Sequence, residues 1–439
     1  MKTICFYFQL HIPMLLRRYR FLEIGQDHYY FDDFANESNV QHLAQTSILP
    51  TNRLLLELIK TSKGKFKAAL SISGISIEMF EQFAPEVMES FVELANTGNV
   101  EFIAEPYAHS LASIFDVDEF IQQVEQHSNL MNELFGVKPT TFRNAEMIYS
   151  DEIGEVVHSM GFKTILTEGS KQVLGWKSPN FMYGHPTIPD LKILVRNMRL
   201  SDDIGFRFSD RSWSDFPLTA EKMMNWIKST DPSEQIFNLF MGYPTFGERQ
   251  KPESGIFEFM RAIPFHALAN RITFSTPAEL AKKYNPISSI TVMYPQSWSG
   301  EEKDVSHWTG NIMQTEALQK LYNQGERVRL CSDRSIKHDW LCLQCSDNFH
   351  YMTTKPWNSF TVWPNYESPF AAFTNYMNVL SDFIGRVNEQ YPSSIDNEEL
   401  NALLTTIYNQ ELKITELEKQ LKHHDSNVEI TEPEYTEDD

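Results

Sequence analysis

Seven short apolar runs, mostly separated by stretches of helical period, constrain the fold of this chain more than any other feature. Each run has the length of a strand, and several are rich in β-branched or aromatic residues. Between the runs, apolar residues three or four positions apart predict helices, for example over 77–97, 117–134 and 151–160. The seven runs cover residues 4–11, 66–72, 100–104, 141–145, 163–167, 192–195 and 236–241.

Strands that alternate with helices predict an α/β fold with parallel strands joined by right-handed crossovers. Seven such units fit an incomplete (β/α)7 barrel or an open doubly wound sheet, and the pattern does not distinguish the two. The connections 168–191 and 196–218 have no clear period. Long connections in such folds usually shape a site.

The character of the sequence changes near residue 285, which predicts three parts. Residues 1–285 form the barrel or sheet, and 286–385 form a mainly helical domain that contains five of the 8 Trp. Residues 386–439 hold a linker, a short heptad helix and an acidic tail. Apolar heptad positions within 397–422 fit a coiled coil that would make a homo-oligomer, or a lone amphipathic helix folded against the body.

The formal net charge of −21 argues against two classes of partner. Such a surface repels nucleic-acid phosphates and anionic membranes, so we expect neither as a partner. A neutral ligand such as a sugar polymer is compatible with it, although solubility alone also explains the charge. The first apolar run is too short for a signal peptide, and no apolar stretch reaches about 18 residues. We therefore expect a cytoplasmic protein.

The four cysteines include one Cys-x-x-Cys pair, Cys342 and Cys345. A zinc site needs four ligands, and no second Cys or His pair at zinc-finger spacing lies nearby. The flanking Trp340 and Leu341 indicate packed core instead. We expect a structural pair, with no metal and no cofactor.

Polar residues follow several of the predicted strands where these end. In parallel α/β folds, ligands bind at the carboxyl ends of the strands. Sugar hydroxyls need polar partners and pyranose faces need aromatic surfaces, so a cleft of these residues suits a carbohydrate. Taken singly, His11 could be a core histidine, Glu146 a helix cap, and Asp202 and Asp203 cap or salt-bridge residues. The candidates are His11, Tyr107, His109, Arg143, Asn144, Glu146, Asp202, Asp203 and Glu248.

The order of motifs over residues 1–385 resembles the α-amylase-like branch of glycoside hydrolase family 57. The matching segments are 11–13 (His-Ile-Pro), 98–109, 142–146 (Phe-Arg-Asn-Ala-Glu), 201–209, 276–279 (Thr-Pro-Ala-Glu) and 346–352. The resemblance implies an incomplete (β/α)7 barrel followed by a helical domain, and α-glucan or maltooligosaccharide as the substrate. It also implies that Glu146 is the nucleophile of a retaining reaction.

The segment after the seventh strand departs from the family. The family segment is similar to Asp-Tyr-Glu-Thr-Phe-Gly-Glu, whereas this chain reads Gly-Tyr-Pro-Thr-Phe-Gly-Glu over 242–248. The acid/base position is therefore Gly242, and glycine cannot donate a proton. A retaining glycosidase needs two carboxyls about 5–5.5 Å apart. Loss of a positioned acid costs roughly 10²–10⁴-fold in rate. Glu248, Asp202 or Asp203 could replace it only if the fold brings one of them into place.

Three functions follow as hypotheses. The first is an α-glucan hydrolase or transferase with weak activity. The second is a catalytically inactive protein that binds glucan in the inherited cleft. The third is a scaffold that acts through its C-terminal helix. A carbohydrate deacetylase-type barrel would need an Asp-His-His metal triad, and His11, His109 and His158 do not have that spacing.

Overall fold

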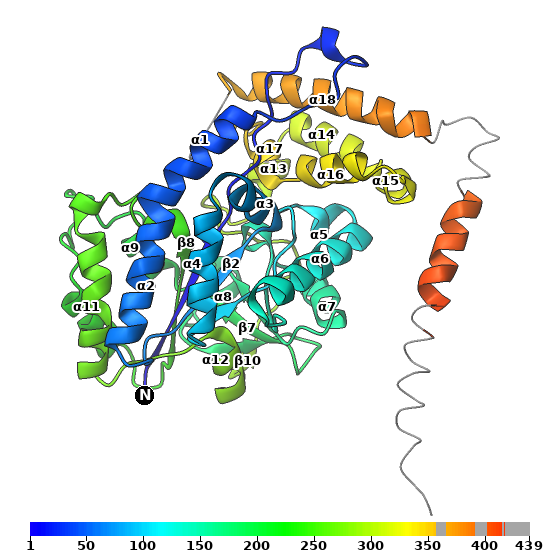
Figure 1. The fold of residues 1–439 in the computed structure, drawn as a ribbon. Coiled ribbons are helices and arrows are strands. Elements are labelled where there is room, and N and C mark those ends of the chain that lie inside the picture. The colour runs from blue at the N-terminus through cyan, green and yellow to red at the C-terminus, as the bar shows by residue number, and fades with distance from the viewer. Residues whose placement is uncertain (357–365, 391–401, 415–416, 418–439) are drawn as a thin grey trace, which may run out of the picture.

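The structure, a computed structural model, describes residues 1–356, 366–390, 402–414 and 417 (Figure 1). Its strands form two sheets, in the orders β3-β2-β1-β8, with β9 beside β1, and β10-β6-β7-β5-β4. All pairs are parallel except β6 with β7. The strands are β1 (Thr3–Leu10), β2 (Ala68–Ile72), β3 (Val100–Phe102), β4 (Thr141–Arg143), β5 (Thr164–Thr167), β6 (Met182–Gly184), β7 (Lys192–Val195), β8 (Ile236–Gly242), β9 (Thr273–Phe274) and β10 (Ser288–Ser289).

A single parallel bridge between Ala104 and Phe142 joins the edge strands β3 and β4. Seven parallel strands therefore follow one another in the order β8-β1-β2-β3-β4-β5-β7. Among the described residues, no ladder pairs β7 with β8. Isolated hydrogen bonds connect them there, including one from Asn238 Nδ2 to the Val195 carbonyl at 2.8 Å. The incomplete (β/α)7 barrel is confirmed, and each of the seven predicted runs contains one of its strands.

The three strands that the sequence pattern did not reveal are β6, β9 and β10. Each has only two or three residues, which is too short for a period of two to be recognised. β6 lies within the 168–191 connection and folds back antiparallel onto β7. Tertiary pairing, rather than a local signal, makes these segments strands.

Helices surround the barrel, and α1, α2 and α4 lie along one side of it in Figure 1. The helix expected over 77–97 is two helices, because Pro85 begins α4 and Ala84 before it has a non-helical backbone. The other two expected helices are α6 and α7. The helices are α1 (Asp33–Leu43), α2 (Leu49–Thr61), α3 (Gly74–Phe83), α4 (Pro85–Asn96), α5 (Ala112–Phe115), α6 (Val117–Phe135), α7 (Asp151–Ser159), α8 (Lys171–Leu174), α9 (Met198–Gly205), α10 (Ala220–Ser229), α11 (Ile256–Ala269) and α12 (Pro277–Lys283).

Short turns of other helix types complete these connections. A π-helical segment, η2, joins α1 to α2 without a break. The 3-10 segment η3 follows β4 and η4 follows β8, so both lie where strands end. The segments are η1 (Phe21–Glu23), η2 (Ala44–Ile48), η3 (Ala145–Met147), η4 (Tyr243–Thr245) and η5 (Pro252–Ser254).

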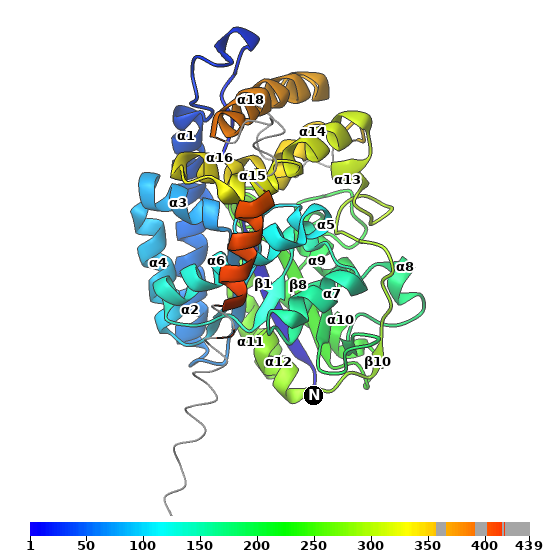
Figure 2. The same ribbon diagram turned by 90° about the vertical axis from the view of Figure 1, so that its right-hand side faces the viewer.

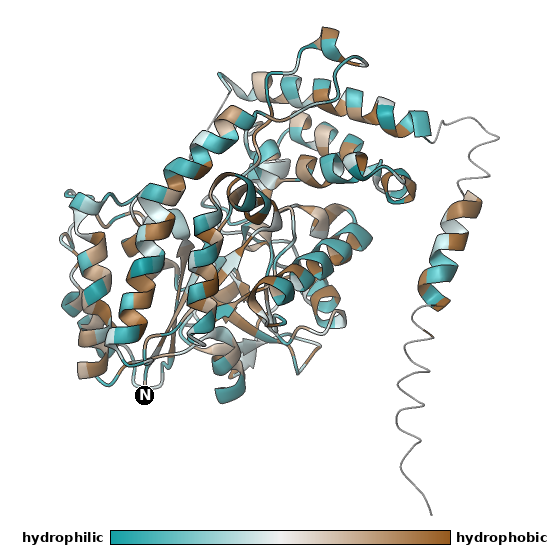
Figure 3. Ribbon diagram, in the orientation of Figure 1, coloured by the Kyte–Doolittle hydropathy of each residue, from teal (hydrophilic) through white to brown (hydrophobic). Residues whose placement is uncertain are grey.

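β1 is the centre of the core, because it pairs with β2 on one side and β8 on the other. Its apolar run is nearly continuous since both faces are covered, as is usual for parallel sheets. Phe6 and Phe8 stack at 5.7 Å between ring centroids on one face. Tyr7, on the other face, shares a hydrogen bond of 2.7 Å with Ser71. Figure 3 shows the matching apolar stripes on the surrounding helices.

A second group of helices covers one end of the barrel (Figures 1 and 2). α18 packs against α14 and α16, and the Tyr376 hydroxyl donates to the Leu343 carbonyl at 2.9 Å. None of the helices in the described ranges is long and apolar enough to cross a membrane. The group comprises α13 (Ser306–Thr309), α14 (Ile312–Tyr322), α15 (Gly325–Leu330), α16 (Arg334–Leu343), α17 (Ser346–His350) and α18 (Pro369–Gln390).

The predicted heptad segment is helical over 402–414. Leu403 and Ile407 are exposed there, and Figure 1 shows this helix apart from the rest of the chain. Leu400 and Leu421 lie outside the described residues. The coiled-coil and homo-oligomer prediction stays a prediction.

Candidate active site

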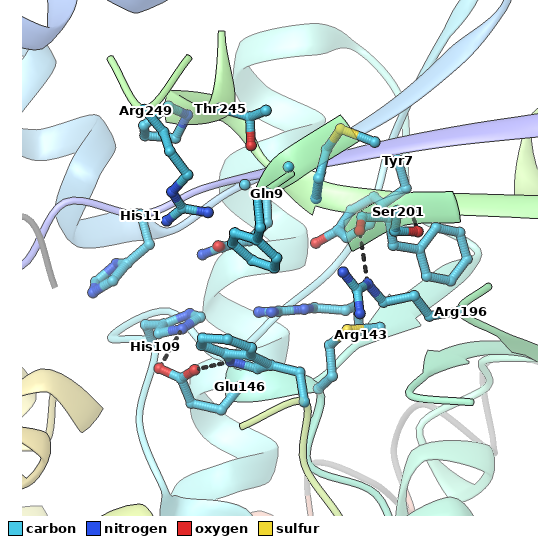
Figure 4. A pocket seen from close by; sticks show the side chains of 18 of the residues that line it. Tyr7, Gln9, His11, His109, Arg143, Glu146, Arg196, Ser201, Thr245 and Arg249 are labelled. Carbon is cyan, nitrogen blue, oxygen red and sulfur yellow. Dashed lines mark hydrogen bonds and ion pairs between the residues drawn. The ribbon is translucent and has the colours of Figure 1, made fainter. Parts of the chain in front are cut away.

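A cleft opens at the carboxyl ends of β1, β4 and β8, beneath the C-terminal helices. Parallel barrels carry their ligand sites at this end. One wall follows β4 and holds Glu146, and Thr245 and Arg249, which follow β8, lie across the cleft from it (Figure 4). We call this second side the facing wall, and Gly242 at the end of β8 also lines the cleft. The whole cleft is lined by Tyr7, Gln9, His11, His109, Arg143, Glu146, Met147, Arg196, Ser201, Gly205, Phe206, Phe240, Met241, Gly242, Pro244, Thr245, Arg249, Trp298, Asp347 and His350.

Glu146 is held in one orientation by the turn after β4 and by three side chains. Its backbone φ is 53°, a left-handed conformation that non-glycine residues adopt mainly where the surroundings impose it, often at functional sites. The Trp298 indole donates to Oε2 at 2.6 Å and the Ser346 hydroxyl donates to Oε1 at 2.9 Å. His109 Nε2 lies 3.4 Å from Oε1. The carboxylate is therefore fixed before any ligand arrives.

His109 connects Glu146 to a second buried carboxylate, because its Nδ1 lies 3.0 Å from Glu105 Oε2. Burial alone would lower the pKa of His109, but the hydrogen bonds to Glu105 and Glu146 outweigh it and raise the pKa to about 9. Burial would likewise raise the pKa of Glu146. His109, Trp298 and Arg143 outweigh that effect and lower this pKa far below its usual range. At neutral pH Glu146 is ionised, as a carboxylate nucleophile must be.

A second carboxylate in the cleft, Asp347, is coupled to His11. His11 Nε2 lies 3.1 Å from Asp347 Oδ2 and 3.3 Å from Cys345 Sγ, and its ring stacks on His109 at 4.2 Å between centroids. Burial, and next the charge of His109, lower the pKa of His11. Burial opposes ionisation of Asp347, but the hydrogen bond from His11 outweighs it and lowers the pKa of Asp347. This carboxyl is thus also ionised at neutral pH.

The facing wall has no carboxylate at the end of β8. Gly242 pairs in register with Gln9 of β1 and has a φ of −69° that any residue can adopt. A Cβ built on Gly242 would lie 3.8 Å from Pro244 Cδ and 4.0 Å from the Gln9 carbonyl, which is ordinary contact. The backbone therefore does not require glycine here, and a Cβ would meet only ordinary contacts.

The structure brings five of the predicted positions together and leaves five outside the cleft lining. His11, His109, Arg143, Glu146 and Gly242 line the cleft. The other five engage neighbours elsewhere, and a substrate-binding role for them stays a prediction. The Tyr107 hydroxyl donates to Glu78 at 2.5 Å, Asn144 Nδ2 donates to the Ile148 carbonyl at 3.0 Å, Asp202 pairs with Arg196, Asp203 pairs with Arg207 at 2.7 Å, and Glu248 pairs with His42 at 2.9 Å.

The residues that support or line the site and were not selected from the sequence include four with a clear place in it: Arg249, Trp298, Ser346 and Asp347. Three of them come from segments far along the chain from Glu146, so no local spacing connects them to it. Ser346 and Asp347 do lie in the 346–352 segment that resembles the family, and that signal could have identified them. Trp298 lies in a connection with no comparable motif.

Comparisons with known proteins agree with this architecture. Residues 5–293 match the sequence model of Glycosyl hydrolase family 57. A Methanocaldococcus jannaschii protein named "Putative alpha-amylase" is 39% identical over 400 residues, which is 87% of this chain and 84% of that protein. This chain belongs to glycosyl hydrolase family 57.

Solved structures share the fold at low identity. A family 57 branching enzyme of Thermococcus kodakaraensis, solved in complex with glucose, superposes with a TM-score of 0.66 at 12% identity, over 92% of this chain and 94% of that one. The 4-alpha-glucanotransferase of Thermococcus litoralis superposes with a TM-score of 0.61 at 14% identity, over 86% of this chain. This chain spans 60% of the glucanotransferase.

Proposed function

We propose that this protein acts on α-glucan with Glu146 as the nucleophile of a retaining reaction, and that its turnover of ordinary glucan is low. The observation that supports this most is the fixed, ionised Glu146 carboxylate in a cleft at the carboxyl ends of the strands. The relatives named as an α-amylase, a branching enzyme and a glucanotransferase support the substrate class.

Low turnover follows from the missing proton donor. Glu146 can attack an anomeric carbon, but a departing sugar alkoxide must receive a proton. Asp347 is held ionised by His11, and His109 holds its proton between Glu105 and Glu146. Gly242 has nothing to donate. The cleft therefore has the attacking group of a retaining glycosidase without the acid.

A second candidate is a protein that binds glucan without turnover. The missing carboxylate at Gly242 favours it, because the rest of the cleft remains formed. The scaffold hypothesis is supported only by the exposed apolar side chains of the 402–414 helix. Neither alternative explains why Glu146 is held as an ionised carboxylate by three side chains.

Reducing-end release from maltoheptaose and glycogen tests the proposal. We expect slow release by the natural sequence, none above background by Glu146→Gln, and faster release by Gly242→Asp. Calorimetric titration with maltoheptaose separates the second candidate, which requires binding without release by the natural sequence. Release by Gly242→Asp alone would then show which missing group silenced the site. Absence of both binding and release in all three would exclude α-glucan as the ligand.

A further inference from the structure

The cleft wall beside Gly242 contains hydrogen-bond donors that no described residue satisfies. Gln9 Nε2 and Thr245 Oγ1 are both buried without a partner among the described residues, and the Thr245 residue is 1% exposed. Gln9 faces Gly242 across the β1–β8 pair, and Thr245 follows three residues later. Buried polar groups of this kind are normally paired, and both residues line the cleft, so we consider a ligand in the cleft that accepts hydrogen bonds.

An arginine lines the same cleft as these two groups. Figure 4 shows the Arg249 guanidinium, like Gln9 and Thr245, on the side of the cleft away from Glu146. It lies 4.8 Å from the Phe206 ring centroid. Burial lowers the pKa of Arg249 to about 10, which leaves it charged at neutral pH. An amide, a hydroxyl and a guanidinium together match the oxygens of a tetrahedral anion, and arginine is a common phosphate ligand.

We propose that inorganic phosphate binds beside Gly242, held by Arg249, Gln9 and Thr245, and that the protein uses it in place of the missing acid to phosphorolyse α-glucan. The inference rests on the proposed function, because it requires Glu146 to attack the sugar. Phosphorolysis requires phosphate as a co-substrate and gives an α-glucosyl phosphate as product. A hydrolase uses water instead and forms no such product.

The chemistry balances with phosphate as the only added reactant. In the first step Glu146 attacks C1, the C1–O bond to the leaving glucan breaks, and H2PO4⁻ gives that oxygen a proton and becomes HPO4²⁻. In the second step an oxygen of HPO4²⁻ attacks C1 from the face that the glucan left. The bond to Glu146 breaks and the carboxylate is restored. Two displacements at C1 retain the α configuration, and no further acid, base or oxidant is needed.

Phosphate suits this role better than a neutral ligand. It titrates near neutral pH, so both protonation states that the two steps need are available. Phosphate also carries the negative charge that a carboxylate at position 242 would have supplied. A sugar hydroxyl could accept hydrogen bonds from Gln9 and Thr245, but it is not an effective acid.

The test measures α-glucosyl phosphate formed from maltoheptaose with and without inorganic phosphate. We expect product only with phosphate, and none with Glu146→Gln. Arg249→Met should raise the KM for phosphate at least tenfold, whereas Arg53→Met, on the exposed face of α2, should leave it unchanged. Gly242→Asp should make release independent of phosphate, because it restores an acid within the protein. Thermal melting of each variant checks its folding.

α-Glucosyl fluoride distinguishes the phosphate inference from the proposed function on which it rests, because fluoride leaves without a proton. If Glu146 is required for its consumption but phosphate yields no glucosyl phosphate from maltoheptaose, the phosphate inference is wrong and the proposed function stands. If the fluoride is not consumed either, both are wrong. An unchanged KM for phosphate in a folded Arg249→Met protein would also overturn the assigned site.

Discussion

The two walls of the cleft differ in whether a strand end carries a held carboxylate. On the β4 wall both oxygens of Glu146 accept hydrogen bonds, and His109 links that carboxylate to Glu105. On the β8 wall Gly242 contributes no side chain, and Gln9 and Thr245 keep donors without partners among the described residues. The Glu146 carboxylate is fixed before binding, whereas Gln9 Nε2 and Thr245 Oγ1, like Nε and Nη1 of Arg143 on the β4 wall, have no hydrogen-bond partner among the described residues. In the proposed function, the β4 wall is the built half, which attacks the sugar, and the β8 wall is the open half, where a proton donor would lie.

Removal of the built half should have the largest effect. Glu146→Gln keeps the shape of the side chain and removes its nucleophilicity, so we expect any glucosyl transfer to fall by roughly 10³-fold or more. Rates with α-glucosyl fluoride measure this directly, because that substrate needs no acid. A variant that retains a tenth of the rate would show that Glu146 is not the nucleophile.

Filling the open half should have the next largest effect. The Cβ of Gly242→Asp meets only ordinary contacts. A carboxyl there should raise hydrolysis of maltoheptaose by roughly 10²-fold or more, within the range expected for a positioned acid. Gly242→Asn has nearly the same volume without the acid and serves as the control. Equal rates in the two variants would contradict an acid position here.

Weakening the built half by one hydrogen bond should have an intermediate effect. Trp298→Phe removes the donor to Oε2 of Glu146, and hydrogen bonds to charged groups contribute about 1.5–3 kcal/mol. We expect the rate to fall at least tenfold and the acidic limb of the pH–rate profile to move to higher pH, because the carboxylate is less stabilised. Ser346→Ala, which removes the donor to the other oxygen, should shift the limb in the same direction.

The protonated His109 predicts how stability depends on pH. Its pKa rises from 6.5 to about 9 in the folded protein, which corresponds to about 3 kcal/mol in favour of folding. That contribution is complete below pH 6.5 and is lost as pH rises through 9. Urea unfolding from pH 6 to 10 should therefore show a decline that His109→Asn largely removes. If His109→Asn shows the same decline in unfolding free energy, another group causes the decline.

The smallest effect is expected for a carboxylate outside the cleft. Glu248 accepts hydrogen bonds from His42, Thr46 and Lys251 and does not line the cleft. We expect Glu248→Gln to change turnover by less than about threefold, the scale of a partly exposed ion pair. A loss that approaches that of Glu146→Gln would identify Glu248 as the replacement acid.

Much of the barrel could be predicted from the sequence, because local physics determines it. The apolar run of β1 requires cover on both faces, and a local capping box of Thr276 with Glu279 starts α12. Pro85 breaks the expected helix by a rule that is also local. The very short strands β6, β9 and β10 were missed since pairing partners, not their own residues, define them.

The sequence by itself determined the alternation of strands and helices, the position of Glu146 after a strand, and the glycine where the family has its acid. Only the tertiary structure decided that Trp298 and Ser346, about 150 and 200 positions away, hold Glu146. It also decided that Arg249 and Gln9 face the space beside Gly242, whereas Asp202 and Glu248 pair elsewhere. The physical reason is that periodicity and capping act over a few residues, whereas a site forms where distant strand ends and loops converge.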